Sequence, residues 1–273
     1  MVRFDAYSAT TTAANHFQLI ELFGPGLTPQ EGRGFHSFGH RLALKDESGA
    51  EVGSVQWGGK HGERTMLEVK GERSPEVVER LRSAFPHRAT RMDSCADFDA
   101  PGAFERLLGT CMAIKRRHRL KGKRDGDWED FPELGRTQYL GTPQSVSMLR
   151  LYEKGKQPEY RHLDRPEWVR AEIQVRPAKE AKSEFSRLTA SEVWGASAWS
   201  RELAGEILRE HVDPHPAGTV WRKSSIEQRT DWICRQGGPT LVELHALLGS
   251  WECVGLTLGE KIKELQEASG KGR

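Results

Sequence analysis

The sequence has few of the features that mark a secreted, zinc-bound or membrane-embedded protein. It contains only four cysteines, and no two of them form a CxxC pair. A disulfide framework or a structural zinc site is therefore not expected, and a reducing cytoplasm fits this composition. No stretch approaches the ~20 consecutive apolar residues of a membrane helix. Residues 1–5 lack the apolar core of a signal peptide, so we expect a soluble chain with no membrane partner.

An excess of charge of one sign is also missing. The chain has 41 Lys and Arg against 39 Asp and Glu, a net charge of +2 over 273 residues. This balance does not exclude a nucleic-acid partner, but it requires any basic surface to be local. The segment Gly58-Gly59-Lys60 lacks the spacing of a phosphate-binding loop, so ATP use is not indicated.

Apolar alternation and turn residues predict several strands in the first two thirds of the chain. A helix is predicted from Ser74, with Pro75 at its first position, to the stop at Pro86. A second helix is predicted to begin at Pro101. The predicted strands are residues 4–10, 41–45, 51–57, 65–70, 88–98, 147–154 and 168–176.

This order of elements predicts an α+β fold, a largely antiparallel β-sheet domain with flanking helices. After Pro177 the pattern changes, and apolar residues recur at helical spacing, as in Leu241, Leu244 and Leu248. We therefore predict a domain of residues 1–178 followed by an all-helical C-terminal region of residues 179–273. The length allows one medium domain with a smaller part appended to it.

Three of the predicted strands carry polar side chains two residues apart, which places these side chains on one face of each strand. If the strands are neighbours, carboxylates, a tyrosine and several cations meet there. Carboxylate ligands suit Mg²⁺ or Mn²⁺ better than zinc. The face residues are Arg91, Asp93 and Asp97 on the first strand, Arg150, Tyr152 and Lys154 on the second, and Arg170 and Glu172 on the third.

These groups together describe a metal-assisted transesterification at a phosphodiester. A tyrosine has an ordinary pKa of about 10, so Tyr152 needs a nearby cation or metal to attack as a phenolate. A plainer interpretation stays open, because Arg–Glu pairs across strands are common on the wet face of a sheet. In that case the chain is an α+β domain of unrelated function.

Four segments resemble a known family in their order along the chain. They are Arg91-Met92-Asp93 with Asp97, Arg136-Thr137-Gln138-Tyr139-Leu140-Gly141 with Ser145, Leu149-Arg150-Leu151-Tyr152-Glu153-Lys154, and Trp168-Val169-Arg170-Ala171-Glu172. This series is similar to the Rep_trans family of rolling-circle replication initiators, which occur in small plasmids and filamentous bacteriophages. The resemblance covers roughly residues 65–178.

The resemblance implies specific roles for these residues. Tyr152 corresponds to the DNA-nicking nucleophile of the family, and Asp93 and Glu172 to the acids that bind Mg²⁺ or Mn²⁺. Asp97 is expected to assist them. Arg150, Lys154 and Arg170 are expected to stabilise charge on the phosphate, and Tyr139 is a weaker alternative nucleophile.

The densest positive segment of the chain lies between residues 115 and 124. It could follow DNA phosphates beside the nicking site, or it could be a solvated loop, as Gly122 suggests. Its basic residues are Lys115, Arg116, Arg117, Arg119, Lys121, Lys123 and Arg124.

The function implied is a site-specific DNA endonuclease and strand transferase that begins rolling-circle replication in the cytoplasm of a bacterial host cell. Its expected partners are the origin duplex, a DNA single strand, the host helicase and polymerase, and a second copy in a homodimer. The helical C-terminal region is expected to contact DNA or a partner. The alternative is a non-catalytic DNA-binding regulator of replication or transcription that keeps the same fold.

Overall fold

The computed structural model describes residues 2–218 and 225–270. The strands are β1 (Val2–Thr11), β2 (Thr28–Arg33), β3 (His40–Lys45), β4 (Glu51–Trp57), β5 (Thr65–Lys70), β6 (Arg88–Asp99), β7 (Arg124–Asp125), β8 (Thr137–Leu140), β9 (Ser147–Tyr152) and β10 (Trp168–Val175). The helices are α1 (His16–Glu21), α2 (Ser74–Ala84), α3 (Ala103–Arg117), α4 (Ala181–Phe185), α5 (Ala198–Ile207), α6 (Ser225–Leu248) and α7 (Trp251–Gly270).

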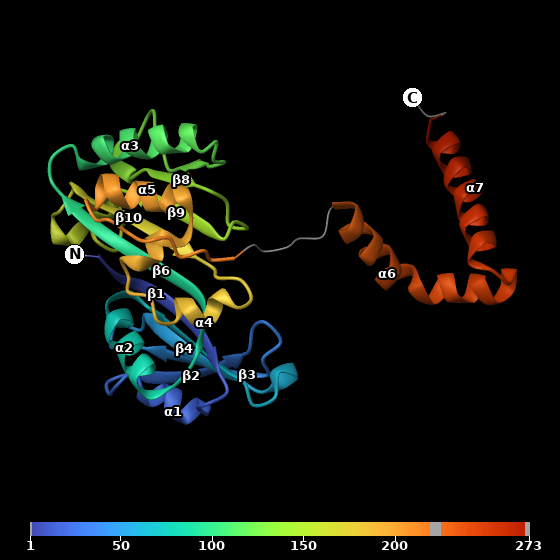
Figure 1. Cartoon of the computed structure of the whole chain (residues 1–273), viewed down its shortest axis with the longest axis horizontal. Coiled ribbons are helices and arrows are strands. Elements are labelled where there is room, and N and C mark those ends of the chain that lie inside the picture. Colours follow the sequence, from blue (N-terminus) through green and yellow to red (C-terminus); the bar gives the residue numbers. More distant parts are fainter. Residues whose placement is uncertain (1, 219–224, 271–273) are drawn as a thin grey trace. The chain divides into compact units, whose positions relative to one another are not determined.

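The ten strands form a single sheet in the order β2-β3-β4-β5-β1-β6-β10-β9-β8-β7, and each adjacent pair is antiparallel (Figure 1). The predicted α+β class, with a largely antiparallel sheet and flanking helices, is therefore confirmed. The long strands β1 and β6 lie at the centre of this order. They join a meander of β2 to β5 on one side to β10, β9 and β8 on the other.

Helices cover one face of the sheet, with α2, α4 and α5 in front of it in Figure 1. The apolar side chains of β10 point to this face and are buried in the hydrophobic core beneath the helices. They are Val169, Ala171, Ile173 and Val175. The strand pattern predicted this face correctly, because alternate side chains of a strand point to opposite sides. The polar residues of β10 must then face the other side.

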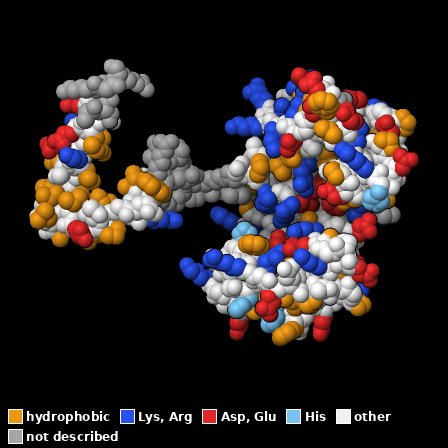
Figure 2. Space-filling model, turned by 180° about the vertical axis from the view of Figure 1, so that it is seen from behind, with side chains coloured by type: hydrophobic (Ala, Val, Ile, Leu, Met, Phe, Trp, Pro, Cys, Tyr) orange, Lys and Arg blue, Asp and Glu red, His pale blue; other side chains and the backbone are white. Residues whose placement is uncertain are grey.

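The opposite face of the sheet bears many charged side chains. Figure 2 shows this side of the first structural unit, where Lys and Arg side chains surround Asp and Glu side chains in a hollowed centre. The charged residues singled out on β6, β9 and β10 are on this face, as their alternation with core residues requires.

Some elements differ from the sequence expectations. The edge strand β2 was not predicted, since its residues are exposed and show no apolar alternation. The short strand β8 was also missed. The strand expected at 147–154 ends at Tyr152, and Lys154 begins a 3₁₀ turn over Lys154–Lys156. Contrary to the sequence prediction, Lys154 is therefore not part of the strand, although its Nζ lies over the ring of Trp168 on β10.

The chain divides into two structural units, Met1–Val220 and Trp221–Arg273. The division falls at residue 220, whereas the sequence suggested a boundary after residue 178. The reason is that α4, α5 and the turn between them carry buried apolar side chains that complete the core over the sheet, among them Phe185, Trp194 and Leu203. A change from strands to helices along the sequence therefore does not mark a domain boundary here.

The second unit consists of α6 and α7, which contact each other. Several large apolar side chains on them are exposed, among them Trp232, Leu247 and Leu256. Among the described residues, no single helix is long and apolar enough to cross a membrane. Of the described helices, the pair Trp232–Leu248 and Trp251–Glu267, bent by 114°, has the length and apolar composition of a span only when both are taken together.

Candidate active site

Three neighbouring strands, β6, β10 and β9, bring the polar residues of the sequence motifs onto one face. The antiparallel register sets Arg170 opposite Asp97 on β6 and opposite Tyr152 on β9. Glu172 lies opposite Arg150 in the same way. Residues directly opposite in a sheet have their side chains on the same face and close together. The register therefore joins motifs that are far apart in the sequence.

The centre of this face is a cluster around the Glu172 carboxylate. The Tyr152 hydroxyl donates a hydrogen bond of 3.1 Å to Glu172 Oε2. Arg150 Nη2 contacts Glu172 Oε1 and also lies 3.3 Å from Asp93 Oδ2. The carboxylates of Asp93 and Glu172 thus both contact Arg150 Nη2, and the second oxygen of Glu172 accepts the hydrogen bond of the Tyr152 hydroxyl.

The Asp93 carboxylate is 1% exposed and is held by further donors. Arg91 Nε donates to Asp93 Oδ1 at 2.9 Å, and Gln174 Nε2 donates to Oδ2 at 3.2 Å. The sequence analysis did not single out Gln174. Gln174 could have been predicted to lie on this face, because it is two residues after Glu172 on the same strand and residues two apart share a face.

Burial changes the proton affinity of the central groups. Burial raises the pKa of Glu172 above its ordinary range, and the Arg150 charge only partly opposes this effect. Burial also raises the pKa of the Tyr152 hydroxyl, and the negative charge of Glu172 raises it further. The phenol is therefore neutral near pH 7. It needs a group to accept its proton, or additional positive charge, before it can act as a nucleophile.

A hollow of about 180 Å³ borders the cluster, lined by Arg91, Asp93, Arg150 and Glu172 together with residues of β1 and β5. The latter include Asp5 and Glu68, which the sequence analysis did not single out. A bulge in β1 between Phe4 and Ala6 interrupts the alternation there. Strict alternation from the buried Phe4 and Tyr7 was therefore not sufficient to assign Asp5 to this face.

Asp97 belongs to a separate cluster on the same face. Its carboxylate accepts hydrogen bonds from Arg170 Nε at 2.7 Å, Arg170 Nη2 at 2.8 Å and Trp168 Nε1 at 2.9 Å. Arg170 is fully buried and also donates to Asp5 Oδ1 at 2.5 Å. The structure therefore does not join Asp97 to Asp93 and Glu172 as the expected third acid. The Arg170 guanidinium contacts the carboxylates of Asp97 and Asp5 and the Trp168 ring.

The ion pair of Asp97 predicts a pH dependence of stability. Burial alone raises the pKa of Asp97, but the Arg170 hydrogen bonds and charge outweigh it and lower the pKa below its ordinary value. A lowered folded-state pKa adds stability above the unfolded pKa of about 4, and this stability is lost as the pH falls through the folded-state value. We expect the difference in unfolding free energy between the wild type and Asp97→Asn to shrink below pH ~4, measured by urea unfolding. A difference that is constant from pH 3 to 7 would contradict this linkage.

Lys154 lies beyond the end of β9 in an aromatic pocket. Its Nζ is 4.4 Å from the centre of the Tyr160 ring and 4.9 Å from that of Trp168. The residue is 5% exposed, and burial lowers the pKa of the ammonium, with the Arg170 charge acting in the same direction. A cation over aromatic faces is stabilised by their quadrupoles. These contacts turn Lys154 toward Tyr160 and Trp168, and its expected role at the phosphate stays a prediction.

The basic segment 115–124 lies at the β7–β8 end of the sheet. It begins in the last turn of α3, which extends to Arg117, so the expectation of a loop is wrong for its first three residues. Cations in a last helical turn are favoured by the helix dipole. Some members have protein partners: Arg117 pairs with Glu202, Lys123 lies 4.7 Å from the centre of the Tyr139 ring, and Arg124 lies 4.2 Å from that of Trp128.

The donor set allows a test of the expected metal. Within residues 2–218 and 225–270, no three His, Cys, Asp or Glu side chains form a group that could hold a metal ion on its own. Mg²⁺, however, is commonly bound through one or two carboxylates together with substrate phosphates and water. Asp93 and Glu172 fit this mode, since both converge on the same cationic group, Arg150 Nη2.

The Arg150 guanidinium carries an additional sign of a binding site. Its Nε is buried and has no hydrogen-bond partner among the described residues. An unsatisfied buried donor is costly, so such groups are rare in folded proteins. A phosphate oxygen is the kind of acceptor that would satisfy this donor, because Arg binds phosphate through its N–H groups.

Comparison with known families identifies the chain. The Rep_trans family, described as replication initiation factors, matches residues 98–247, which is more than half of the chain. The chain belongs to the Rep_trans family. The matched part of this Rep_trans protein includes Arg150, Tyr152 and Glu172 and begins after Asp93.

Comparison with solved structures shows a similarity to a rolling circle replication initiator protein from Geobacillus stearothermophilus. The two share 18% sequence identity, and the alignment covers 84% of the Rep_trans protein and 91% of that chain with a TM-score of 0.49. The comparison with curated proteins found no match.

Proposed function

We propose that this protein is a rolling-circle DNA replication initiator that cuts one strand at the origin and rejoins it through a 5′-phosphotyrosyl link on Tyr152. The observation that carries the proposal is the 3.1 Å hydrogen bond from the Tyr152 hydroxyl to Glu172, in a cluster with Asp93 and Arg150. Membership of a family of replication initiation factors supports it.

In the proposed reaction the Tyr152 oxygen attacks the scissile phosphorus and forms a new O–P bond, while the bond from phosphorus to the 3′ oxygen breaks. The leaving oxygen takes up a proton and becomes the 3′ hydroxyl from which the host polymerase extends. Glu172 Oε2 accepts the hydrogen bond of the phenol and is the group positioned to receive its proton. Because the link conserves the phosphodiester energy, the later closure requires no ATP.

The charged neighbours have complementary roles in this proposal. Arg150 and Arg91 border the hollow and offer positive charge to the phosphate. Asp93 and Glu172 Oε1 are the groups that would hold Mg²⁺ or Mn²⁺, and such an ion supplies Lewis-acid polarisation of a phosphoryl oxygen. The exposed apolar side chains of α6 and α7 fit contact with another protein, such as a host helicase or a second copy of the chain.

A cleavage assay tests the proposed function. The full chain is incubated with supercoiled DNA that carries its own gene region, with Mn²⁺ added. We expect nicked circles with protein covalently attached to the 5′ end of the cut strand. Nicking without attached protein would refute the phosphotyrosyl route. DNA binding without any nicking on the proper origin would instead support the non-catalytic regulator.

The two acidic clusters predict a ranking of variants. Asp93→Asn and Glu172→Gln should lower Mn²⁺-dependent nicking about 10- to 100-fold, because both carboxylates converge on the site. Asp97→Asn should have a smaller effect on nicking, since its carboxylate is held by Arg170 and Trp168. The measurement is the initial nicking rate across a Mn²⁺ titration. Equal losses in the three variants would contradict this division of roles.

A further inference from the structure

The active-site hollow is the first of three that follow β1 from the charged face to the end of the strand, where residues of α4 and of the segment after it line the last one. It shares Ser8, Glu68 and Arg91 with a hollow of about 450 Å³. That second hollow shares Thr10 and Arg64 with a third of about 490 Å³. We call these three hollows together the β1 groove. It extends from the candidate active site along β1 to the end of the strand.

Positive charge dominates the part of the β1 groove beyond the active-site hollow. Six Lys and Arg side chains line the second and third hollows, and Glu68 is the sole Asp or Glu among their lining residues. Arg91 and Glu68 are shared with the active-site hollow, which leaves five cations that are not. The five are Arg64, Arg88, Arg176, Lys182 and Arg187. None of the five forms an ion pair with a carboxylate of the part of the chain that the structure describes. Their charges are therefore available to an anionic ligand.

The middle of the β1 groove also has an aromatic wall. The rings of Phe38 and His61 lie 4.3 Å apart between centres, and His61 bonds to the backbone oxygen of His36 at 2.7 Å. His36 and Ser37 have positive φ values of 54° and 72°, so the loop adopts a conformation that L residues rarely use. Proteins that bind single strands combine a positive groove for the backbone with rings that contact the bases.

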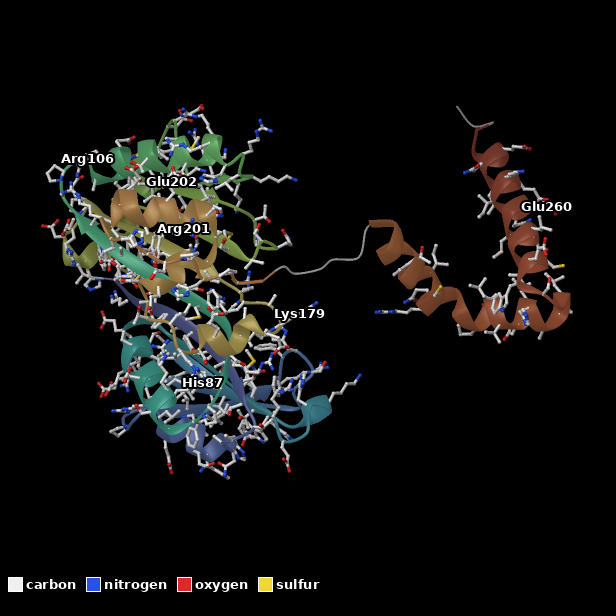
Figure 3. The ribbon with its side chains drawn as sticks, in the orientation of Figure 1. His87, Arg106, Lys179, Arg201, Glu202 and Glu260 are labelled. Carbon is white, nitrogen blue, oxygen red and sulfur yellow. The ribbon has the colours of Figure 1, made fainter. Side chains whose placement is uncertain are left out.

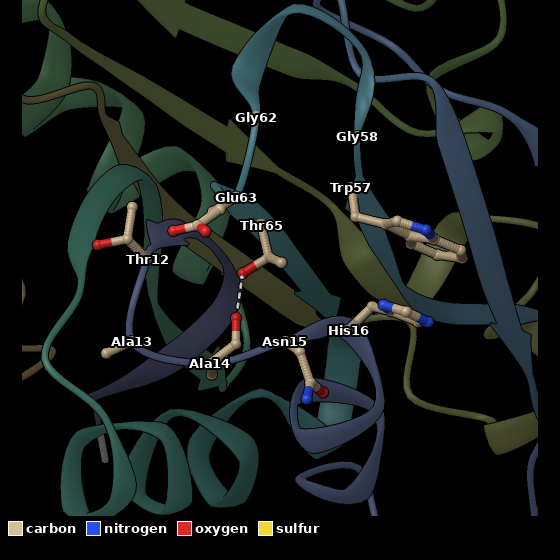
Figure 4. A pocket seen from close by; sticks show the side chains of 10 residues that line it. All are labelled: Thr12, Ala13, Ala14, Asn15, His16, Trp57, Gly58, Gly62, Glu63 and Thr65. Atoms are coloured by element: carbon tan, nitrogen blue, oxygen red, sulfur yellow. Dashed lines mark hydrogen bonds between the residues drawn. The ribbon is translucent and has the colours of Figure 1, made fainter.

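An adjoining pocket provides a contrast. It shares Thr12 and Ala13 with the third hollow and measures about 410 Å³ (Figure 4). Trp57 and His16 stack at 4.1 Å on its wall. Its lining contains Glu63 and no Lys or Arg, so the run of positive charge ends before it.

We propose that the β1 groove binds the single strand of DNA that leads to the scissile phosphate. The inference rests on the proposed function, since it starts from the active-site hollow. A single strand fits because the cations line a series of connected hollows along one strand of the sheet, which matches the single line of phosphates of such a strand. The groove differs from the basic segment 115–124, which lies beyond β9 at the β7–β8 end of the sheet.

Arg64 and Lys182 are the residues to test. Both line the groove, both are outside the Tyr152 cluster, and Arg64 is exposed while Lys182 is half-buried. The matched control is the pair Arg106 and Arg201, which lie on α3 and α5 in the helical layer. In Figure 3 both residues are well separated from His87, a lining residue of the third hollow. The two double variants are Arg64→Ala with Lys182→Ala, and Arg106→Ala with Arg201→Ala. Each removes two positive charges from the full chain.

Binding of a fluorescein-labelled single-stranded origin oligonucleotide is measured by anisotropy, with EDTA present so that no cleavage occurs. We expect the groove variant to bind about tenfold more weakly, and the slope of log K against log salt to fall by about 1.4, near 0.7 for each lost contact. The control variant should bind like the wild type. Thermal melting by circular dichroism checks that both variants are folded.

An unchanged single-strand affinity in the folded groove variant would overturn the proposal. An equal loss in the control, or a loss confined to duplex DNA, would overturn it too. The assay is independent of the cleavage chemistry. If the wild type forms no covalent adduct but the groove variant loses single-strand binding, then the nicking function fails and the groove assignment stands. If the adduct forms but the groove variant binds normally, then the groove assignment fails alone.

Discussion

Replacing Tyr152 with phenylalanine is expected to abolish the covalent DNA–protein adduct and to lower nicking by about a thousandfold or more. The change removes the attacking oxygen and the hydrogen bond of 3.1 Å to Glu172. The ring and its packing stay. The measurement is the yield of protein-linked nicked circles from supercoiled origin DNA with Mn²⁺.

The same substitution should leave the fold intact. One neutral hydroxyl contributes about 1 kcal/mol net, and Glu172 keeps its contact with Arg150. Single-strand binding in EDTA should be unchanged, because Tyr152 does not line the second or third hollow of the β1 groove. If the Tyr152→Phe variant lost activity because it unfolded or no longer bound DNA, the result would not support Tyr152 as the nucleophile.

Tyr139 provides the matched control for this variant. It lies on β8 directly opposite Arg150, on the same face of the sheet, and its ring contacts Lys123. Tyr139→Phe removes the same atom from a neighbouring position. We expect it to form the adduct at near wild-type yield. If Tyr139→Phe lost the adduct and Tyr152→Phe kept it, the assignment of the nucleophile would be reversed.

Removal of the Arg170 guanidinium is expected to have the largest effect on stability. Its Nε and Nη2 bind Asp97, and its Nη1 binds Asp5, while the side chain is fully buried. In Arg170→Met two partly buried carboxylates lose their main counter-charge. Breaking such a pair by removing one partner costs about 3–5 kcal/mol, even where replacing the whole pair would cost little. Urea unfolding of the full chain measures the loss.

An exposed ion pair provides the comparison for Arg170. Arg165 Nε lies 2.7 Å from Asp99 Oδ2, and both side chains are more than a third exposed. Solvent screening reduces such a pair to less than about 1 kcal/mol, so Arg165→Ala should unfold near the wild-type midpoint. If Arg170→Met were as stable as the wild type but failed to nick DNA, the result would favour the expected role of Arg170 at the phosphate.

The strand patterns predicted the faces of β10 well and the ends of β9 poorly. In β10 the apolar residues Val169, Ala171, Ile173 and Val175 alternate over the whole strand, and all are buried in the core. In β9 the polar sequence continues past Tyr152 without a break, although the backbone turns there. Alternation of apolar and polar residues indicates a strand with one buried face. Where neither face is apolar, the sequence pattern does not indicate where the strand ends.

The sequence predicted which residues gather at the candidate site better than it predicted which of them contact one another. Tyr152, Arg150, Asp93 and Glu172 meet as the motif order suggested. Asp97 was assigned to the same group because it shares a strand face with Asp93. The structure separates the two, since Arg170 on the adjacent strand lies opposite Asp97 and binds it. Side chains two residues apart on one strand can thus belong to different clusters.

By itself the sequence determined the α+β class and the strands that carry polar faces, and it supplied the residues proposed for phosphodiester chemistry, because these depend on local periodicity and side-chain chemistry. The tertiary structure decided which charges meet, where the first unit ends and that a basic groove follows β1. Those features depend on pairing between segments far apart in the chain, such as Arg170 with Asp5, a separation of 165 residues. Local patterns do not encode the register of such pairs, which is set by the packing of the whole sheet.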